Sequence, residues 1–202
     1  MASTSEIRRR IGSVRQTQKI THAMYLISQA KLRKAKQELD NTRPYFQALQ
    51  NEVGRVFNTD STVESRYLMP LNDNEKPLPG VAACLLITAD KGLAGAYNQN
   101  AIRQAQQLLR QHEGASLYVV GEYGRRWFAQ RGVPIEKSFL YTAQNPTLRR
   151  ARQIAELLLE RFDNGEINEV WVVYTDMKNG LEAVVRLSLI HISEPTRLRC
   201  IS

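Results

Sequence analysis

Residues 4–57 form one long stretch of helical pattern, and this stretch constrains the fold more than any other feature of the chain. At 1.5 Å per residue, about 50 helical residues make a rod of roughly 75 Å, too long for a domain of this size to enclose. Steps of four and three residues follow one stripe that is apolar at both ends and polar in the middle. Such spacing is the period of a coiled coil. The stripe consists of Ile7, Ile11, Val14, Gln18, Thr21, Tyr25, Ser28, Leu32, Ala35 and Leu39.

No segment adjacent in sequence can cover so long a stripe, so the helix requires a partner helix from elsewhere in the chain or from another subunit. Ser3, Thr4 or Ser5 is expected to cap it, with Glu6 in its first turn. Pro44 is expected to kink or break the rod, because proline lacks the amide hydrogen of a helix residue. A long surface helix with a solvated basic face is the alternative interpretation.

The positive charge of the chain is concentrated in this same stretch. The 202 residues carry 28 Lys/Arg and 20 Asp/Glu, a net charge of +8. Residues 1–36 hold nine of the basic residues and a single acid, Glu6, whereas basic and acidic residues balance over the rest of the chain. A basic segment on a neutral body indicates an acidic partner, either nucleic acid, an anionic membrane or an acidic protein surface.

Residues 58–80 are polar and proline-rich, which predicts a linker. Beyond it, strand patterns alternate with helix patterns, which favours a mostly parallel sheet with helices on its faces. Val81–Thr88 is a continuous apolar run, typical of a strand buried on both faces. Asn179-Gly180 allows a hairpin into the last strand. The other predicted strands are 116–120, 133–139, 169–175 and 181–187, and the predicted helices are 98–111, 123–130 and 148–162.

Composition and residue spacing exclude several function classes. No window approaches 18 consecutive apolar residues, so no membrane-spanning helix is predicted, and the charged N-terminus lacks the apolar core of a secretory signal. The two cysteines, Cys84 and Cys200, and three well-separated histidines indicate neither a disulfide scaffold nor a zinc site. Cys84 lies within an apolar strand and is predicted to be an inert core residue.

Segment 88–98, TADKGLAGAYN, follows the first strand and precedes a helix, a position where α/β proteins bind ligands. A phosphate loop is one hypothesis, but neither GxGxxG nor GxxxxGK[ST] is present. A tight structural turn containing Gly92 and Gly95 is the favoured interpretation. Asp90 and Lys91 could form a catalytic pair, but no nucleophile or metal-ligand set accompanies them, so an ion pair at the surface or an interface is preferred. No catalytic residue, metal ligand or cofactor is predicted.

Four segments resemble the gamma subunit of the F-type ATP synthase, and the likeness runs over residues 1–186. The longest is IRRRIGSVRQTQKITHAM at 7–24, continuing to AKLRKA at 30–35, which resembles the family pattern I-x-x-R-I-x-S-V-x-x-T-Q-K-I-T-x-A-M. Segment 88–98 resembles the family loop S-D-[RK]-G-L-C-G-[GA]-[FY]-N, with Ala89 in place of serine and Ala94 in place of cysteine. Segments 120–132 and 162–175 resemble the family's second strand with its helix and the last central strand.

The resemblance implies an α/β fold, with a long N-terminal coiled-coil helix and a Rossmann-like, three-layer domain around a mostly parallel sheet. It implies a non-catalytic central-stalk (rotor) subunit of the proton-transporting ATP synthase, without a cofactor. The implied partners are the alpha and beta subunits of the ring, the epsilon subunit and the membrane c-ring, at the cytoplasmic face of the bacterial plasma membrane. The residues implied to contact the ring are Arg8, Arg9, Lys19, Met24, Lys31, Arg33 and Lys34. Those implied to form a structural loop near the epsilon and c-ring domain are Asp90, Lys91, Gly92 and Gly95.

Residues 187–202 do not resemble the family. Segment 187–197, LSLIHISEPTR, matches the translation of a transposon-type DNA sequencing adaptor, and the family's C-terminal helix is missing. We therefore expect that the gene was cut near residue 186 and read into adaptor. The predicted organisation is a helix at 1–57, a linker at 58–80, an α/β domain at 81–186 and a non-native tail at 187–202.

Two other functions stay open from the sequence alone. A nucleic-acid-binding protein could use the basic helix as an arm, although the coiled-coil spacing and the few aromatic residues for base stacking argue against it. A nucleotide-dependent α/β enzyme is supported only by the fold class and one glycine-containing loop. The sequence favours the rotor subunit over both.

Overall fold

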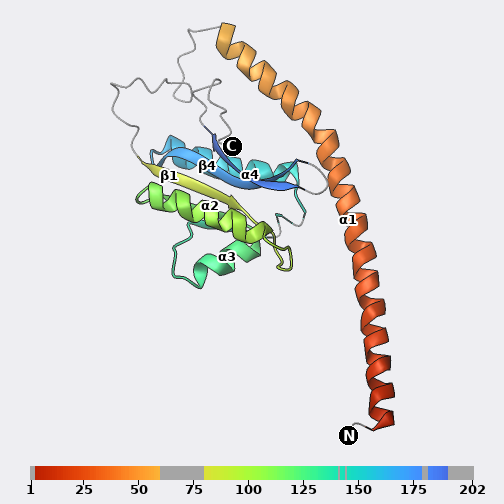
Figure 1. Ribbon diagram of the computed structural model, residues 1–202. Coiled ribbons are helices and arrows are strands. Elements are labelled where there is room, and N and C mark those ends of the chain that lie inside the picture. Colours follow the sequence, from red (N-terminus) through yellow and green to blue (C-terminus); the bar gives the residue numbers. More distant parts are fainter. Residues whose placement is uncertain (1–2, 60–79, 141, 144, 179–181, 191–202) are drawn as a thin grey trace. The chain divides into compact units, whose positions relative to one another are not determined.

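The structure, a computed structural model, describes residues 3–59, 80–140, 142–143, 145–178 and 182–190. The chain divides into two compact units, Met1–Ser61 and Thr62–Ser202, and each is described by itself. The first contains one long helix, and the second contains a sheet with helices packed on both faces (Figure 1). Most of the predicted linker and the predicted hairpin turn at Asn179-Gly180 lie outside the described residues.

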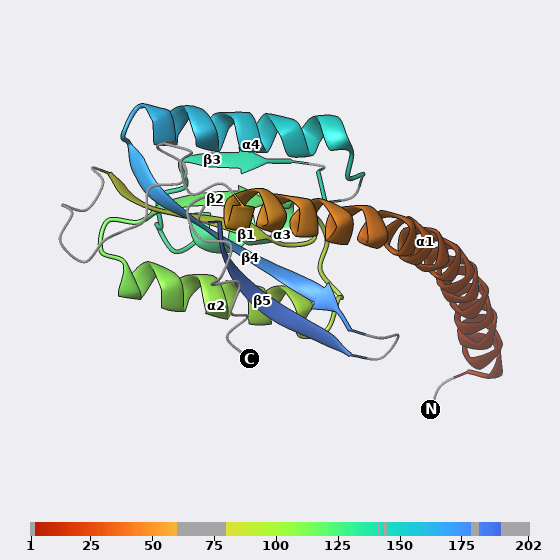
Figure 2. The same cartoon turned by 90° about the horizontal axis from the view of Figure 1, so that it is seen from above.

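Helix α1 spans Thr4–Thr59, which is 56 residues and extends two residues past the predicted end. Ser3 caps it, because the Ser3 hydroxyl accepts from the amide of Ser5 at 3.3 Å and the Ser3 carbonyl accepts from the amide of Ile7 at 3.1 Å. Pro44 lies inside the helix, so the break considered from the sequence does not occur. Figures 1 and 2 show α1 as a continuous, curved helix. Proline removes a single intrahelical bond, and the ladder resumes on both sides of it.

Five strands form one sheet in the order β3-β2-β1-β4-β5. The first four strands in the chain pair in parallel, and β5 runs antiparallel to β4, so the predicted mostly parallel sheet is confirmed. In the central register, Cys84 pairs with Leu117 on one side and Trp171 on the other. The strands are β1 Val81–Ile87, β2 Ser116–Val120, β3 Lys137–Phe139, β4 Ile167–Met177 and β5 Ala183–Ile190.

Helices cover both faces of the sheet and give the domain its three layers (Figure 2). On one face, α2 (Tyr97–Gln111) and α3 (Glu122–Ala129) pack over a core that includes Leu86 and Phe128. On the other face, α4 (Leu148–Asp163) packs over a second core that includes Tyr118. The continuous apolar run of β1 faces both cores, as the sequence predicted for a strand buried on both sides.

Two strands have bounds that differ from the predicted ones. The third strand was expected over 133–139, but β3 begins at Lys137, because Pro134 has no amide donor and the amide of Val133 donates to the Phe128 carbonyl instead. The last strand was expected to end at Leu187, but β5 reaches Ile190 and pairs with β4 over residues assigned to the tail.

Candidate interaction surfaces

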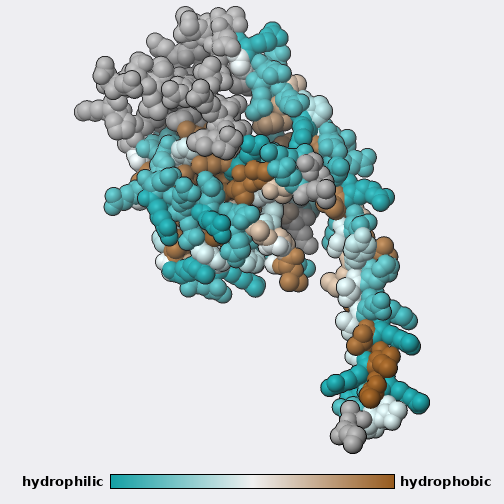
Figure 3. All heavy atoms as spheres, in the orientation of Figure 1, coloured by the Kyte–Doolittle hydropathy of each residue, from teal (hydrophilic) through white to brown (hydrophobic). Residues whose placement is uncertain are grey.

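Helix α1 exposes the apolar residues of the predicted coiled-coil stripe. Ile7 and Val14 are 48% and 66% exposed, and Leu32, beyond the polar middle, is 61% exposed. Figure 3 shows hydrophobic side chains gathered on α1 toward its N-terminus. A single helix cannot bury its own side chains, so this stripe requires another surface to pack against. Further exposed apolar residues of α1 are Ile11, Ile20, Met24, Leu26, Ile27, Leu39, Phe46 and Leu49.

Beside and within the polar middle of the stripe, the hydroxyls of two threonines turn back to the helix backbone. The Thr17 hydroxyl donates to the Ser13 carbonyl at 3.0 Å, and the Thr21 hydroxyl donates to the Thr17 carbonyl at 2.9 Å. The rings of His22 and Tyr25 stack beside them with centroids 6.3 Å apart. These hydroxyls do not need a partner, whereas Ile20, Met24 and Ile27 of the same segment are more than half exposed on another side of the helix. Polar residues within a coiled-coil stripe fix the register in which two helices pair and lower the stability of the pair. The polar middle of this stripe is of that kind.

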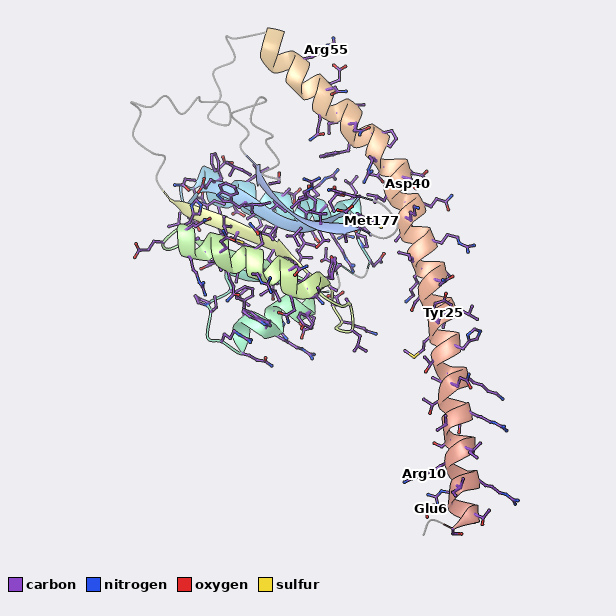
Figure 4. The ribbon with its side chains drawn as sticks, viewed as in Figure 1. Glu6, Arg10, Tyr25, Asp40, Arg55 and Met177 are labelled. Carbon is purple, nitrogen blue, oxygen red and sulfur yellow. The ribbon has the colours of Figure 1, made fainter. Side chains whose placement is uncertain are left out.

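The basic residues predicted to contact a partner are exposed on α1, the helix on which Figure 4 labels Arg10 and Tyr25. Arg8, Lys19 and Arg33 share one side of α1, because 3.6 residues per turn bring the second and third back to within about 20° of the first. Lys34 forms an ion pair with Glu38 at 3.8 Å, and both side chains are largely exposed. The other predicted contact residues, Arg9, Met24 and Lys31, are exposed on the remaining sides. The helix therefore carries a basic side defined by Arg8, Lys19 and Arg33 in addition to its apolar stripe, and this side also holds the exposed Leu26, five full turns from Arg8.

The second predicted site, the loop 88–98, begins at Thr88, which ties the end of β1 to α3. The fully buried Thr88 hydroxyl donates to the Val120 carbonyl at 2.9 Å and accepts from the Gly124 amide at 3.1 Å. A Cβ atom at Gly124 would lie 2.8 Å from this hydroxyl oxygen, and one at Gly121 would collide with the Thr88 carbonyl oxygen. Both positions are glycine because the two segments approach each other so closely.

Polar side chains hold the loop from both ends. The Asp90 carboxylate accepts from the Glu122 amide at 3.1 Å, so this predicted site residue anchors the loop to the first turn of α3. The buried Asn98 side chain accepts from the Ala89 amide at 2.9 Å and donates to the Lys91 carbonyl at 3.3 Å. The loop is a tight structural turn, the interpretation that the sequence favoured over a phosphate loop. The other predicted site residues, Lys91, Gly92 and Gly95, are exposed at its tip.

Sequence reasoning did not select Thr88 or Asn98 as site residues, although they organise the loop. The bonds of Thr88 reach 32 and 36 residues along the chain, to Val120 and Gly124, and no local pattern records such a contact. The residue types of Thr88 and Asn98 gave only a weak sign of this role. Threonine and asparagine at the two ends of a glycine-containing turn commonly hydrogen-bond to its backbone.

Two side chains of the sheet domain have strongly shifted pKa values. Hydrogen bonds from Arg125 and Arg126, at 2.6 Å, lower the pKa of Glu122 to about 2. Burial raises the pKa of the Cys84 thiol to about 12, so the thiol stays protonated and unreactive, as predicted for a core cysteine. Over the described residues, no three His, Cys, Asp or Glu side chains are grouped to hold a metal ion. None of the helices within the described ranges is long and apolar enough to cross a membrane.

Together, the sheet domain with helices on both faces and the long helix with its exposed apolar stripe define an α/β fold with a long N-terminal helix. The family described as ATP synthase matches residues 3–196, and the chain belongs to this family. Its curated relatives include the ATP synthase gamma chain of Caldanaerobacter subterraneus subsp. tengcongensis, 46% identical over 90% of this chain and 60% of the relative. The sodium ion specific ATP synthase gamma chain of Acetobacterium woodii is 35% identical over 86% of this chain and 55% of the relative.

A solved structure shares the fold at lower sequence identity. The central stalk and c-ring structure of the Tetrahymena thermophila mitochondrial ATP synthase matches with a TM-score of 0.62 and 24% identity, over 85% of this chain and 72% of that chain. The chain spans about 60% of the length of the curated relatives it matches. The nucleic-acid-binding alternative finds no support among these relatives.

Proposed function

We propose that the chain acts as the central-stalk (rotor) subunit of a proton-transporting F-type ATP synthase, which couples ion flow through the membrane sector to ATP synthesis in the alpha/beta ring. The observation that carries this proposal is the exposed stripe with 3.5-residue spacing on α1, in a chain of the ATP synthase family. A subunit of this kind is not itself catalytic. It acts by contacting the conformations of the ring subunits unequally, because only differential binding shifts a conformational equilibrium.

The two sides of α1 fit two kinds of contact. The apolar stripe would pack against a second helix of the stalk, which the family supplies from its C-terminal region. The basic side would face acidic loops of the ring, and exposed arginine and lysine side chains interact there without burying charge. The ring contacts would come from Arg8, Arg9, Lys19, Met24, Lys31, Arg33 and Lys34.

The sheet domain would lie toward the membrane sector in this proposal. The loop with Asp90, Lys91, Gly92 and Gly95 would lie near the epsilon subunit and the c-ring, at the cytoplasmic face of the bacterial plasma membrane. A rigid loop suits that position, because bonds from Asp90 and Asn98 fix its backbone before any partner binds. Peripheral attachment through other subunits requires no membrane insertion of this chain.

We also propose that residues 187–202 derive from adaptor sequence, on the strength of the eleven-residue match at 187–197. Pairing of 187–190 with β4 does not depend on that origin, because an alternating apolar segment extends an open sheet edge whatever its source. Sequencing the intact source locus tests this proposal. A locus that encodes the same tail would refute it.

A pull-down by an alpha/beta ring reconstituted from the Caldanaerobacter relative tests the rotor proposal. Charge reversal of the shared basic side, in the triple variant Arg8→Glu, Lys19→Glu, Arg33→Glu, is expected to abolish capture at low salt, since it replaces attraction by repulsion. The matched control carries the same change in charge on exposed arginines of α2 and α4, and is expected to bind like the unchanged chain. Its substitutions are Arg103→Glu, Arg110→Glu and Arg152→Glu. Equal capture of both variants would contradict the proposal.

A further inference from the structure

The coiled-coil stripe of α1 has the same spacing when it is read from either end. Its steps alternate between four and three residues from Ile7 to Leu39, and polar residues occupy its middle. A second copy of α1, turned end for end about a two-fold axis level with Ala23, therefore places a stripe residue opposite every stripe residue of the first. Apolar residues then face apolar ones, and polar residues face polar ones. The opposed pairs are Ile7 with Leu39, Ile11 with Ala35, Val14 with Leu32, Gln18 with Ser28 and Thr21 with Tyr25.

Three more apolar residues lie beside the polar middle of the stripe, centred on nearly the same level. Ile20, Met24 and Ile27 are each more than half exposed. Met24 comes one residue after the axis, so the reversed arrangement brings the Met24 side chains of the two copies close together. Stripe residues between Val14 and Tyr25 line one shallow groove along α1, and the side chains of a facing helix pack into such a groove. The polar middle is therefore flanked by apolar area that a second copy can cover.

The charges that flank the stripe favour the antiparallel direction over a parallel one. Two contacts of a parallel pair would join like charges, Arg10 with Arg15 and Lys31 with Lys36. In the antiparallel pair, Arg10 lies opposite Glu38 instead. One contact between like charges remains there, Arg8 with Lys36. Charged residues at flanking positions set the orientation of coiled-coil helices, so this difference selects the reversed arrangement.

We propose that two copies of this chain pair through α1 as an antiparallel coiled coil, with its two-fold axis level with Ala23. The overlap covers residues 7–39, roughly 50 Å of helix, and covers apolar side chains that a single helix leaves exposed. The inference goes beyond the proposed function, because it describes the chain before it joins other subunits. A second copy and a second stalk helix would occupy the same stripe, so the two copies have to separate before either enters a stalk.

The pairing is expected to be reversible, because the positive charge of residues 1–36 in both copies opposes it. We expect a dissociation constant on the order of 10 μM. Sedimentation equilibrium of the full chain, from about 1 to about 200 μM, measures this constant, since the dimer fraction follows chain concentration. Unfolding experiments on single chains are therefore done at about 1 μM or below, where the copies are separate.

Substitutions on and off the stripe locate the contact. Leu32→Glu places a carboxylate opposite Val14 of the second copy at both ends of the pair, and is expected to weaken pairing at least about hundredfold. Leu26→Glu is the matched control, because it makes the same change at an exposed leucine of α1 outside the stripe, and it is expected to pair like the unchanged chain. Circular dichroism of each variant checks that α1 keeps its helix content.

A mixture of two weakened variants tests the antiparallel register. Val14→Lys alone is expected to weaken pairing as much as Leu32→Glu, because its ammonium group faces an apolar residue. In a mixed antiparallel pair, the introduced lysine faces the introduced glutamate at one end, and both native residues meet at the other. An equimolar mixture is therefore expected to recover pairing to within about tenfold of the unchanged chain. A parallel pair would leave both introduced charges unpaired.

Three results would overturn the inference. A chain that stays monomeric at about 200 μM does not pair with itself. The proposed function would then stand, because capture by the alpha/beta ring tests it separately. Equal weakening by Leu26→Glu and Leu32→Glu would show that the stripe is not the contact. If both single variants stay apart and their mixture does not recover pairing, the copies do not meet in the antiparallel register.

Discussion

The two units of the chain treat their apolar side chains in opposite ways. In the sheet domain, Leu86 and Val173 are fully buried between strands and helices. In α1, Leu32 and Phe46 are 61% and 56% exposed. Both units are rich in leucine, isoleucine and valine, so composition does not separate them. The separation comes from periodicity, because a continuous apolar run predicts a strand within a closed core, whereas a stripe with 3.5-residue spacing predicts a surface that needs another helix.

Their hydrogen bonds differ in the same sense. The Thr88 hydroxyl bonds to the backbone of Val120 and Gly124, which lie 32 and 36 positions further along the chain. On α1, by contrast, the hydroxyls of Thr17, Thr21 and Thr42 each donate to the carbonyl four residues earlier. Local bonds form in any helix and add no tertiary structure. The sheet domain therefore has the means to fold by itself, and the stability of α1 depends on whatever packs against its stripe.

A matched pair of leucine substitutions tests this contrast with the largest expected effect. Leu86→Ala removes a fully buried side chain from the sheet core and is expected to lower the free energy of unfolding by about 2–5 kcal/mol. Leu32→Ala makes the same chemical change on the exposed stripe of α1 and is expected to change it by less than about 0.5 kcal/mol. Urea unfolding of the two variants, followed by circular dichroism, measures both values. A Leu32→Ala variant as unstable as Leu86→Ala would mean that α1 is buried within this chain.

Substitution of one glycine in each unit tests the same contrast at the backbone. Gly121→Ala would drive a methyl group into the Thr88 carbonyl oxygen at a φ of +97°, and is expected to destabilise the sheet domain by about 1–3 kcal/mol or more. Gly12→Ala places the same methyl group on α1, where no atom lies within 4 Å, and is expected to stabilise the helix by about 1 kcal/mol.

Thermal melts of the Gly12 and Gly121 variants, with helix content measured by far-ultraviolet circular dichroism, separate the two effects. If Gly121→Ala were neutral, the close approach of β1 to α3 at Thr88 would be disproved. If Gly12→Ala reduced the helix content, a neighbour packed against that turn of α1 would be indicated.

Much of the fold could be predicted because its signals are local. The apolar run at Val81–Thr88 and the amphipathic helix at 148–162 were each found within a residue of their observed bounds. The prediction was less exact where a single residue acts through its surroundings. The predicted helix continues through Pro44, because the cost of the lost bond, about 3 kcal/mol, is confined to one turn of a long helix. Pro134 acted the other way and shortened β3 to Lys137–Phe139.

The candidate sites were predictable to a smaller degree. The charge count identified residues 1–36 as a basic segment, because charge can be read from the local sequence, and the proposed ring contacts within it stay a prediction. The glycines located the loop 88–98 in the sequence, but the hydrogen bonds that hold it could not be predicted. Thr88 and Asp90 bond to residues between Val120 and Gly124, which lie 32 or more positions away. The positive φ of Leu93, +60° within the same loop, was also invisible in the sequence, because leucine is not a residue that signals a left-handed conformation.

Removing an ion pair from each of the two units is expected to have the smallest effect on stability. The pKa of Glu122 is lowered from 4.5 to about 2 by Arg125 and Arg126, so this carboxylate stabilises the folded state fully above pH 4.5 and loses that contribution as the pH falls toward 2. Glu122→Gln is expected to lower the free energy of unfolding by less than about 1 kcal/mol at neutral pH, since the arginines are solvated. This loss should vanish toward pH 2. Glu38→Gln, which removes an exposed pair on α1, is expected to have no measurable effect. Urea titrations across this pH range measure the deficit of each variant, and a constant deficit for Glu122→Gln at every pH would show that the arginines stabilise α3 by packing rather than by charge.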